Sequence, residues 1–414
     1  MRSGQAKGRT SYDFRARSMS RPYQEPLRTH TKLQRNFVRL ADNKSASCQS
    51  FKILTWNVLA DGLAQNGDFV KTPLPLLEWS YRMPLIIEEL KEAQADIICL
   101  QEVNRYEELE HHLGLLGYQG CFLAKISSPC ERYMYPRDGV AIFFNPDRFQ
   151  LQGQPQGTMF LDEDGLRRSQ GFLQVLLKDK ASNRKVVVVT THLKAKEGAA
   201  EEQIRIQQIR QLLHHLKKDL LIESQFTTSS SSNGNGGGQR EGRSSNKFQD
   251  GNGNGHYHGG PLSVSSPRNG NTNSSEVQDQ HHTPVIILGD FNATPESQTC
   301  REIRAHTSGL QSIWDVKAMR QSGSFSPILE SVERLASSLF GASAEQEFST
   351  WKFRSKGESK RVIDHIWFTC GRTLAPISRW KMLSEEEIGP CALPCACYPS
   401  DHLALLTEFA WDDS

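Results

Sequence analysis

The sequence lacks a long run of apolar residues. Stretches such as Val186–Val189 and Val285–Leu288 are far shorter than the ~20 consecutive apolar residues that a membrane helix needs. We therefore expect a soluble protein without a membrane span. With 414 residues, 37% of them apolar, the chain can form a sizeable core in one large domain or two smaller ones.

The chain also lacks an excess of either charge. Lys and Arg number 49 and Asp and Glu number 47, which gives a net charge of +2. This balance excludes a surface that is basic throughout, as a nucleic-acid coat requires, but it is compatible with a locally basic pocket.

The cysteines do not form a pattern typical of a disulfide framework. There are nine, an odd number at scattered spacings, which favours a reducing, intracellular setting. Cys391, Cys395 and Cys397 lie close together along the chain. A zinc site there is one interpretation, although the spacing is not a CxxC pair and no fourth ligand is evident. Partly buried free thiols are the alternative.

Residues 1–50 form a basic, polar N-terminal segment. The first forty contain eight arginines but only two acidic residues, and they lack the apolar region of a secretory signal. This composition is typical of a mitochondrial transit segment. A disordered extension without a targeting role is the alternative, because no amphipathic helix is evident. The expected location is the cytoplasm, with mitochondrial targeting if the segment acts as a signal.

Short apolar runs alternate with helical periodicity from residue 51 onward. This alternation predicts an α/β protein whose sheets are covered on both faces. The expected strands are Phe51–Leu59, Asp96–Leu100, Val140–Phe144, Val186–Thr191, Pro284–Leu288, Val362–Phe368 and Leu403–Phe409. The expected helices are Trp79–Gln94 and Ile204–Leu221.

A low-complexity segment interrupts this pattern at about residues 224–282. It is rich in Ser, Gly, Asn, Gln and His, and a stretch such as Ser229–Gly238 has no side chains that could form a core. We expect the segment to be disordered. We interpret it as an insertion within a single domain, 51–414, because polar residues of interest lie on both sides of it. A linker between two domains is the alternative.

Polar residues stand at the ends of two predicted strands. Glu102 follows one, while Asp290 and Asn292 follow another, two residues apart and therefore on the same side. Carboxylate and amide oxygens suit a hard divalent cation. The simpler interpretations are an exposed Glu that opens the next helix and an Asx turn that ends a strand.

Histidines and their neighbours occupy similar positions. His192 ends a run of valines and threonines, His402 stands beside Asp401, and Asp364 lies within a strand-like run. An Asp in such a run needs a partner, and orienting a His ring is a common use. A structural His and a structural salt bridge are the alternatives. Six strand-like segments carry such groups, which favours a shared site at one edge of the sheets.

The order of these motifs resembles the endonuclease/exonuclease/phosphatase superfamily, and its deadenylase-like branch in particular. The motifs are Trp56-Asn57, Gln101-Glu102, Thr191-His192, Gly289–Asn292, Ile363-Asp364 and Ser400–His402. The resemblance runs from Phe51 to the C-terminus apart from the insertion. It implies a four-layer α/β sandwich of two packed mixed sheets, with the active site at one edge. It also implies Mg²⁺-dependent attack of water on phosphorus, with one or two ions and with Mn²⁺ able to substitute.

The resemblance also implies roles for individual residues. The expected metal ligands are Glu102, Asn57 and Asp401. The expected catalytic residues around the water and the phosphate are His192, Asp290, Asn292, Asp364 and His402. Asp364 is expected to orient the ring of His402.

The longer matches, such as Ser349–Lys352, resemble one subgroup of this branch, whose activity is removal of the 2′-phosphate from NADP(H). The residues expected to bind substrate are Lys125, Lys194, Lys196, Trp351 and Lys352. Three lysines near a metal suit a compact ligand with several phosphates, although solvated surface lysines are the simpler interpretation. Lys196 stands where the subgroup has Arg, so a planar fork for phosphate is lost there.

Three functions remain open from the sequence. The favoured one is an NADP(H) 2′-phosphatase with NADP⁺ or NADPH as its partner. A 3′-5′ poly(A) exoribonuclease that releases AMP from RNA would use the same catalytic groups. An inactive RNA-binding or scaffold subunit is a third, and the intact set of polar residues argues against it. We expect a monomer.

Overall fold

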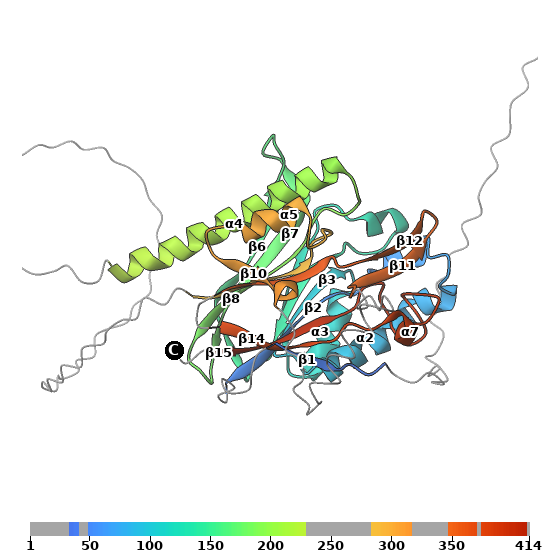
Figure 1. Cartoon of the computed structure of the whole chain (residues 1–414), viewed down its shortest axis with the longest axis horizontal. Coiled ribbons are helices and arrows are strands. Elements are labelled where there is room, and N and C mark those ends of the chain that lie inside the picture. Colours follow the sequence, from blue (N-terminus) through green and yellow to red (C-terminus); the bar gives the residue numbers. More distant parts are fainter. Residues whose placement is uncertain (1–32, 41–48, 229–282, 317–346, 371–373, 412–414) are drawn as a thin grey trace, which may run out of the picture. The chain divides into compact units, whose positions relative to one another are not determined.

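The computed structural model describes residues 33–40, 49–228, 283–316, 347–370 and 374–411 (Figure 1). Residues up to His214 and from Thr283 onward belong to one compact unit, so segments on both sides of the predicted insertion build the same body. From Ser229 on, the predicted insertion lies outside the described residues, as do residues 1–32 of the N-terminal segment. None of the described helices is long and apolar enough to cross a membrane.

The first sheet has seven strands, and β2 and β3 in its middle run parallel. The other neighbouring strands are antiparallel. In spatial order the strands are β1 (Phe37–Arg39), β14 (Leu374–Trp380), β15 (Leu405–Trp411), β2 (Ser50–Asn57), β3 (Ile97–Val103), β5 (Gly139–Phe144) and β4 (Gln119–Ala124).

The second sheet has six strands, and its one parallel pair, β8 with β9, joins residues on either side of the predicted insertion. In spatial order the strands are β10 (Leu310–Ser312), β13 (Asp364–Thr369), β9 (Val285–Asp290), β8 (Lys185–His192), β7 (Arg167–Asp179) and β6 (Phe149–Leu161). A separate hairpin consists of β11 (Thr350–Arg354) and β12 (Gly357–Arg361).

The two sheets pack face to face. β2, β3 and β5 of the first sheet contact β8 and β9 of the second, and the apolar side chains between them are buried. Gln101 of β3 crosses this interface, because its Nε2 donates to Thr190 Oγ1 of β8 at 3.0 Å. Val186–Val189 are all buried, as expected for a β-branched run in a strand covered on both faces.

Helices cover the outer faces. On the first sheet lie α2, whose Ile86 and Leu90 join the core, and α3, which contacts β4. On the second lie α5, which contacts β10, and the part of α4 up to His214 (Figure 1). The helices are α1 (Asp61–Asn66), η2 (Leu74–Leu77), α2 (Trp79–Ala93), α3 (Tyr106–Leu115), η3 (Pro129–Tyr133), α4 (Ala199–Thr228), α5 (Gln298–Arg304), η4 (Ile313–Asp315) and α7 (Glu385–Ile388). The predicted four-layer α/β sandwich is confirmed.

Two expectations need correction. Residues 33–40 are not a loose extension: β1 pairs with β14, and Arg35 is buried with its Nη1 donating to Glu89 Oε1 at 2.8 Å. The long hairpin β6–β7 was not predicted, because β6 is mostly polar and half-exposed and lacks a clear alternation.

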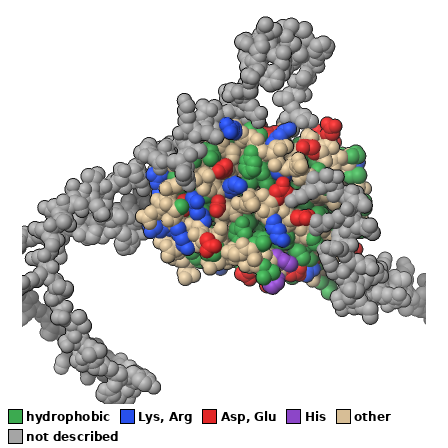
Figure 2. Space-filling model, turned by 90° about the horizontal axis from the view of Figure 1, so that it is seen from below, with side chains coloured by type: hydrophobic (Ala, Val, Ile, Leu, Met, Phe, Trp, Pro, Cys, Tyr) green, Lys and Arg blue, Asp and Glu red, His purple; other side chains and the backbone are tan. Residues whose placement is uncertain are grey.

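On the face drawn in Figure 2, basic and acidic side chains are interspersed, in keeping with the small net charge.

Candidate active site

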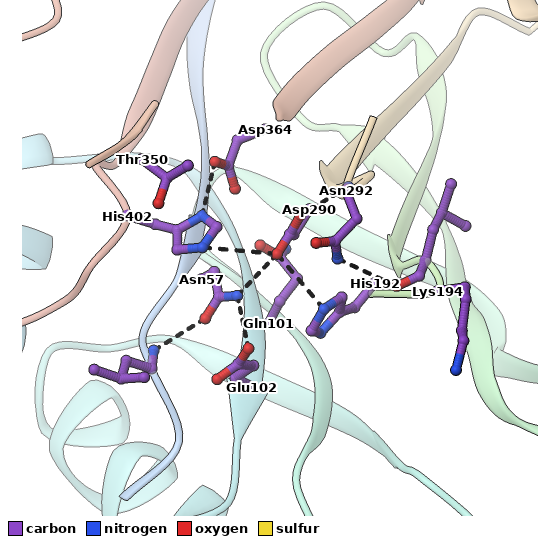
Figure 3. A network of polar contacts seen from close by, with 12 residues as sticks. Asn57, Gln101, Glu102, His192, Lys194, Asp290, Asn292, Thr350, Asp364 and His402 are labelled. Atoms are coloured by element: carbon purple, nitrogen blue, oxygen red, sulfur yellow. Dashed lines mark hydrogen bonds and ion pairs between the residues drawn. The ribbon is translucent and has the colours of Figure 1, made fainter. Parts of the chain in front are cut away.

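Three of the predicted site residues lie in one row across the second sheet. His192 at the end of β8 is in register with Asp290 at the end of β9, and Asp290 is in register with Asp364 at the start of β13. The distance from His192 Nε2 to Asp290 Oδ2 is 3.5 Å. Residues far apart in the sequence therefore meet because of strand pairing alone (Figure 3).

Gly289 makes this close approach of β8 and β9 possible. Its φ is +146°, and a Cβ placed there would lie 2.0 Å from the carbonyl oxygen of Thr191. A side chain at position 289 would therefore push β9 away from β8. The glycine thus fixes Asp290 beside His192.

Glu102 enters the site through a distortion of β3. The pairing of β3 with β5 skips between Leu100 and Val103, and Glu102 has a φ of +56°. Such a bulge re-aims a side chain, and a non-glycine residue in this conformation stores strain that functional sites often hold. The Glu102 carboxylate is held by the backbone, because Ala60 N donates to its Oε2 at 3.1 Å.

Asn57 at the end of β2 connects the two carboxylates. Its Nδ2 donates to Glu102 Oε1 at 3.1 Å and to Asp290 Oδ2 at 3.0 Å, while its Oδ1 accepts from Leu59 N at 3.0 Å. The amide nitrogen therefore holds two like charges at one point between the two sheets (Figure 3). The amide oxygen is occupied by the backbone, so the predicted contact of Asn57 with a metal stays a prediction.

His402 and Asp364 form a buried pair. His402 Nδ1 and Asp364 Oδ2 lie 2.9 Å apart, and Ser349 Oγ donates to the same carboxylate oxygen at 2.6 Å. Burial lowers the pKa of His402, but the Asp364 carboxylate, helped by Asp290, outweighs it and raises the pKa to about 9. Because Nδ1 faces Asp364, Nε2 is left to face Asp290 at 3.9 Å.

His192 has the opposite electrostatic environment. Burial, together with the positive charge of Lys125, lowers its pKa to about 4. The ring is therefore neutral at physiological pH, and it can donate from only one nitrogen. One site thus contains a charged and a neutral imidazole on either side of Asp290.

Asn292 takes part in both of the arrangements considered from the sequence. Its backbone N donates to Asp290 Oδ1 at 2.9 Å, which is the Asx turn, and its φ is +49°. Its side chain nevertheless lines the same cavity as Asp290. The turn fixes the orientation of the Asp290 carboxylate. The Asn292 Nδ2 donates to Leu193 O at 3.3 Å, which leaves the amide oxygen for a ligand.

A cavity of about 800 Å³ is lined by Glu102, His192, Asp290, Asn292 and His402, whereas Asn57 and Asp364 lie behind its wall. Cations from the β11–β12 hairpin and from the segment after β8 also line it, namely Lys196, Lys352, Arg354, Lys356 and Arg361. Burial raises the pKa of Asp401, but Lys352 and Arg354 outweigh it and hold the pKa well below its usual range. Lys352 Nζ donates to Asp401 Oδ2 at 2.6 Å. Asp401 therefore orients two cations, and its support of a metal stays a prediction.

A sequence model of the Endonuclease/Exonuclease/phosphatase family matches residues 54–402, a span that contains every residue of this site. The chain belongs to this family. Nocturnin of Rattus norvegicus is 29% identical over 385 residues, which are 92% of this chain and 70% of that protein. The CCR4-Not complex 3'-5'-exoribonuclease subunit Ccr4 of Schizosaccharomyces pombe is 26% identical and aligns with 89% of this chain and 51% of its own length.

Solved structures agree with this assignment. The human nocturnin catalytic domain with bound sulfate superimposes with a TM-score of 0.57 at 25% identity, covering 91% of this chain and 97% of that domain. ANGEL2, at 21% identity and a TM-score of 0.59, shares the fold. Nocturnin is the subgroup to which the longer sequence matches pointed, so this resemblance is confirmed. As a member of the family, the chain is a metal-dependent phosphoester hydrolase.

The donor set suits the divalent cation that the family requires. Glu102 and Asp290 both approach the Asn57 amide nitrogen, and two neighbouring carboxylates are stabilised by a hard cation between or beside them. Asp290, Asp364 and His402 also lie within 4.8 Å of one another. However, Asp364 and His402 are bonded to each other, so of these three we assign only Asp290 to the metal region.

The predicted substrate-binding residues have different positions. Lys352 and Lys196 line the large cavity, whereas Lys194 does not. Lys125 is nearly buried and pairs with Asp138, so it lies beside His192 rather than at the mouth. Trp351 was wrongly expected to contact substrate: its side chain is buried, and its Nε1 donates to Glu358 Oε1 at 2.6 Å.

The cysteine group lacks the ligands of a zinc site among the described residues. Cys395 Sγ and Cys397 Sγ lie 3.4 Å apart, while Cys391 is exposed. The one group of three or more potential ligands in the described part of the chain contains none of them. Free thiols are therefore the interpretation that fits.

Sequence reasoning missed several residues of this family site. Ser349 received no role, although its hydroxyl also accepts from the backbone N of Ile363 and of Asp364. The cations Arg354, Lys356 and Arg361 were overlooked, and the dense basic residues of 352–361 in a chain of balanced charge were the available signal. Nothing in the sequence marked Tyr133, which lines the cavity and is 42% exposed.

Proposed function

We propose that the chain removes the 2′-phosphate of NADP(H), with Mg²⁺ as its cation and NAD(H) and inorganic phosphate as products. The observation that supports this most is the cavity, whose wall contains five cations beside the carboxylate and histidine cluster. Lys352 and Arg354 pair with Asp401, and Arg361 pairs with Glu197. Lys196 and Lys356 are the cations that can face the phosphates without giving up such a pair. A compact ligand with three phosphates places more charge in such a cavity than one diester of an extended strand does. The similarity to nocturnin over most of the chain supports the same assignment.

Glu102 and Asp290 would hold the metal, which supplies neutralisation of charge on the phosphoryl oxygens and a bound water of lowered pKa. Asn57 keeps both carboxylates in place through a single amide nitrogen. The Asx turn engages Asp290 Oδ1, which accepts from Asn292 N. Asp290 Oδ2 therefore faces the other carboxylate and the histidines, where it can accept a proton from the attacking water.

The histidines act on the phosphate. His402, whose Nδ1 is fixed by Asp364, directs Nε2 toward the cluster and can donate to a phosphoryl oxygen as negative charge develops there. His192 supplies a second, neutral donor on the other side of Asp290. The leaving 2′-oxygen takes a proton from solvent water and becomes the ribose hydroxyl, and the proton accepted by Asp290 returns to solvent.

The deciding experiment compares two products. Full-length protein with Mg²⁺ is expected to release phosphate from NADP⁺ and no AMP from oligo(A). Glu102→Ala should lower the phosphate release by at least about a hundredfold, because the metal carboxylate is lost. Glu107→Ala, which removes an exposed carboxylate of α3, is the matched control and should retain full activity. An NADP⁺ mixture that stays inert with wild-type protein contradicts the proposal.

The second candidate is a 3′-5′ exoribonuclease acting on poly(A), favoured by the similarity to the Ccr4 exoribonuclease subunit. It predicts that the protein releases AMP from oligo(A) and that Glu102→Ala abolishes this release as well. Release of AMP without release of phosphate from NADP⁺ would establish this candidate in place of the first.

A further inference from the structure

One part of the cavity lining carries no charge. It consists of Leu59, Leu63, Asn66 and Tyr133, from α1 with its preceding residue pair and from the end of η3. Tyr133 is the one tyrosine among the described residues that line the cavity, and 42% of its surface is exposed. An aromatic ring left open in a cavity of charged groups is available to a flat ligand group.

The backbone on either side of Tyr133 is held in place before any ligand arrives. η3 is capped by Ser128, whose Oγ accepts from Cys130 N at 3.1 Å and is also bonded to the buried Asp138. The segment after η3 packs on α1: a Cβ at Gly62 would lie 3.0 Å from Tyr135 Cγ. A platform supported in this way does not lose much conformational entropy on binding.

The uncharged wall adjoins the metal carboxylate. Ala60, the residue before α1, donates its backbone N to Glu102 Oε2 at 3.1 Å. A group bound against this wall therefore lies close to the reacting phosphate. In NADP(H) the group closest to the 2′-phosphate, one ribose away, is the adenine ring.

We propose that Tyr133 is the stacking platform for the adenine base of the substrate. The inference rests on the proposed function, because it assigns the uncharged wall to the base and the cationic hairpin to the remaining phosphates. Stacking of a base on an aromatic side chain contributes to affinity, and it is tolerant of the rest of the ligand. The phenol hydroxyl is not needed for it.

The test uses three variants of the full-length chain. Tyr133→Ala is expected to raise the KM for NADP⁺ about tenfold to a hundredfold while kcat changes less than about threefold. Tyr133→Phe keeps the ring and should stay close to wild type. Met134→Ala removes a neighbouring apolar side chain that is 87% exposed and not among the cavity-lining residues, and it should have no effect.

A base-free substrate and a binding measurement separate the possible failures. Hydrolysis of glycerol 2-phosphate should be equal in all variants, and a parallel loss in Tyr133→Ala would overturn the stacking role in favour of general damage. Calorimetry should give a dissociation constant for AMP that is about tenfold higher, or more, in Tyr133→Ala than in wild type. AMP binding of equal strength, or none by wild type, overturns the inference. AMP binding that depends on Tyr133, with no phosphate released from NADP⁺, overturns the proposed function and leaves the platform in place.

Discussion

Three residues at the strand ends of the site adopt backbone conformations that most side chains disfavour. Gly289, Glu102 and Asn292 all have positive φ, and each lies at or near the end of a strand. For a non-glycine residue this conformation costs roughly 1–3 kcal/mol, which the surrounding packing must offset. The strain places the Glu102 carboxylate and the Asn292 amide where strand geometry alone would not.

Gly289→Ala is expected to unfold the site and to weaken the fold. The added Cβ meets a backbone carbonyl at 2.0 Å, which no rotamer change can relieve. We expect a loss of about 3 kcal/mol or more in the free energy of unfolding, measured by urea denaturation, together with loss of activity. Gly114→Ala is the control: it lies in α3 with nothing within 4 Å of the new Cβ, and it should be neutral or stabilising by up to ~1 kcal/mol. Equal stability of the two variants would refute this account.

Lys125→Met is expected to destabilise the protein by roughly 3–5 kcal/mol at neutral pH, because it leaves Asp138 as a buried charge without its cation. Burial raises the pKa of Asp138, but Lys125 outweighs it and lowers the pKa. A lowered pKa stabilises the fold above the unfolded value of ~3.9 and ceases to do so as the pH falls through the folded value. The gap between wild type and variant in urea denaturation should therefore narrow below about pH 4. The double variant with Asp138→Asn should recover much of the loss, and a single variant as stable as wild type would show that the pair is weak.

Among individual residues, the sequence indicated the reacting groups but not the side chains that hold these groups in place. Asp290, Asp364 and His402 could be predicted, because a charged group at a buried strand needs a partner to offset its desolvation. Ser349 and Tyr133 could not, since a serine or an exposed tyrosine in a loop has no local signature. The sequence could not show that Asp401 pairs with Lys352 and Arg354, because only the tertiary structure brings these residues together.

Among the elements, the β11–β12 hairpin contributes most of the cations. It is anchored to the loop after α1: the guanidinium of Arg354 lies 3.5 Å from the centroid of the Phe69 ring, and Lys71 Nζ lies 3.3 Å from that of Phe353. Its other side presents Lys360, which pairs with Glu385 of α7. One hairpin therefore has a cavity-facing and an outward-facing set of cations.

Lys356→Gln together with Arg361→Gln is expected to raise the KM for NADP⁺ roughly threefold to tenfold, because two positive charges are removed from the cavity wall. Lys356 is exposed, whereas Arg361 is half-buried and pairs with Glu197. The KM of the double variant should also depend less on salt than that of wild type. Lys360→Gln removes one positive charge from the same hairpin but outside the cavity, and its KM should be unchanged. Equal effects of the cavity-facing and outward-facing changes would mean that only the overall charge matters.

The central elements could be predicted because their apolar runs are β-branched and short, as in β8 and β9. The hairpins β6–β7 and β11–β12 could not. Their residues are largely polar and show no clear alternation, and pairing with the next strand along the chain gives them their extended conformation. Strand β1 was missed for the same reason: three residues have no periodicity, and β14 gives them their conformation.

For the molecule as a whole, the core and the metal region are separate. Glu102, Asp290 and Asp364 lie at or next to the ends of β3, β9 and β13, whereas the apolar side chains along these strands form the core. On the face drawn in Figure 2, charges of both signs are interspersed. The fold should therefore not depend on the cation. Residues 224–228 were expected to be disordered but belong to α4. Monomeric state, mitochondrial targeting and the disorder of residues 229–282 stay predictions.

Removal of metal is expected to abolish activity while the protein stays folded. EDTA should reduce phosphate release from NADP⁺ to background with little change in the far-UV circular dichroism spectrum, and excess Mg²⁺ or Mn²⁺ should restore it. Added Mg²⁺ should raise the melting temperature slightly in wild type, since a ligand that binds only the folded state stabilises it, and not in Glu102→Ala. Unfolding by EDTA would contradict the separation of the core from the metal region, and full activity in the presence of EDTA would contradict the need for a metal.

Strand β15 has a further consequence, for the order in which the protein is made. Although Leu405–Trp411 come late in the chain, they are inserted between β14 and β2 inside the first sheet, and His402 lies just before them. On the ribosome, β2 keeps an open edge and Asp364 has no imidazole partner until this strand has emerged. A nascent or prematurely terminated chain is therefore inactive, and its exposed strand edges make it a target for chaperones and proteases.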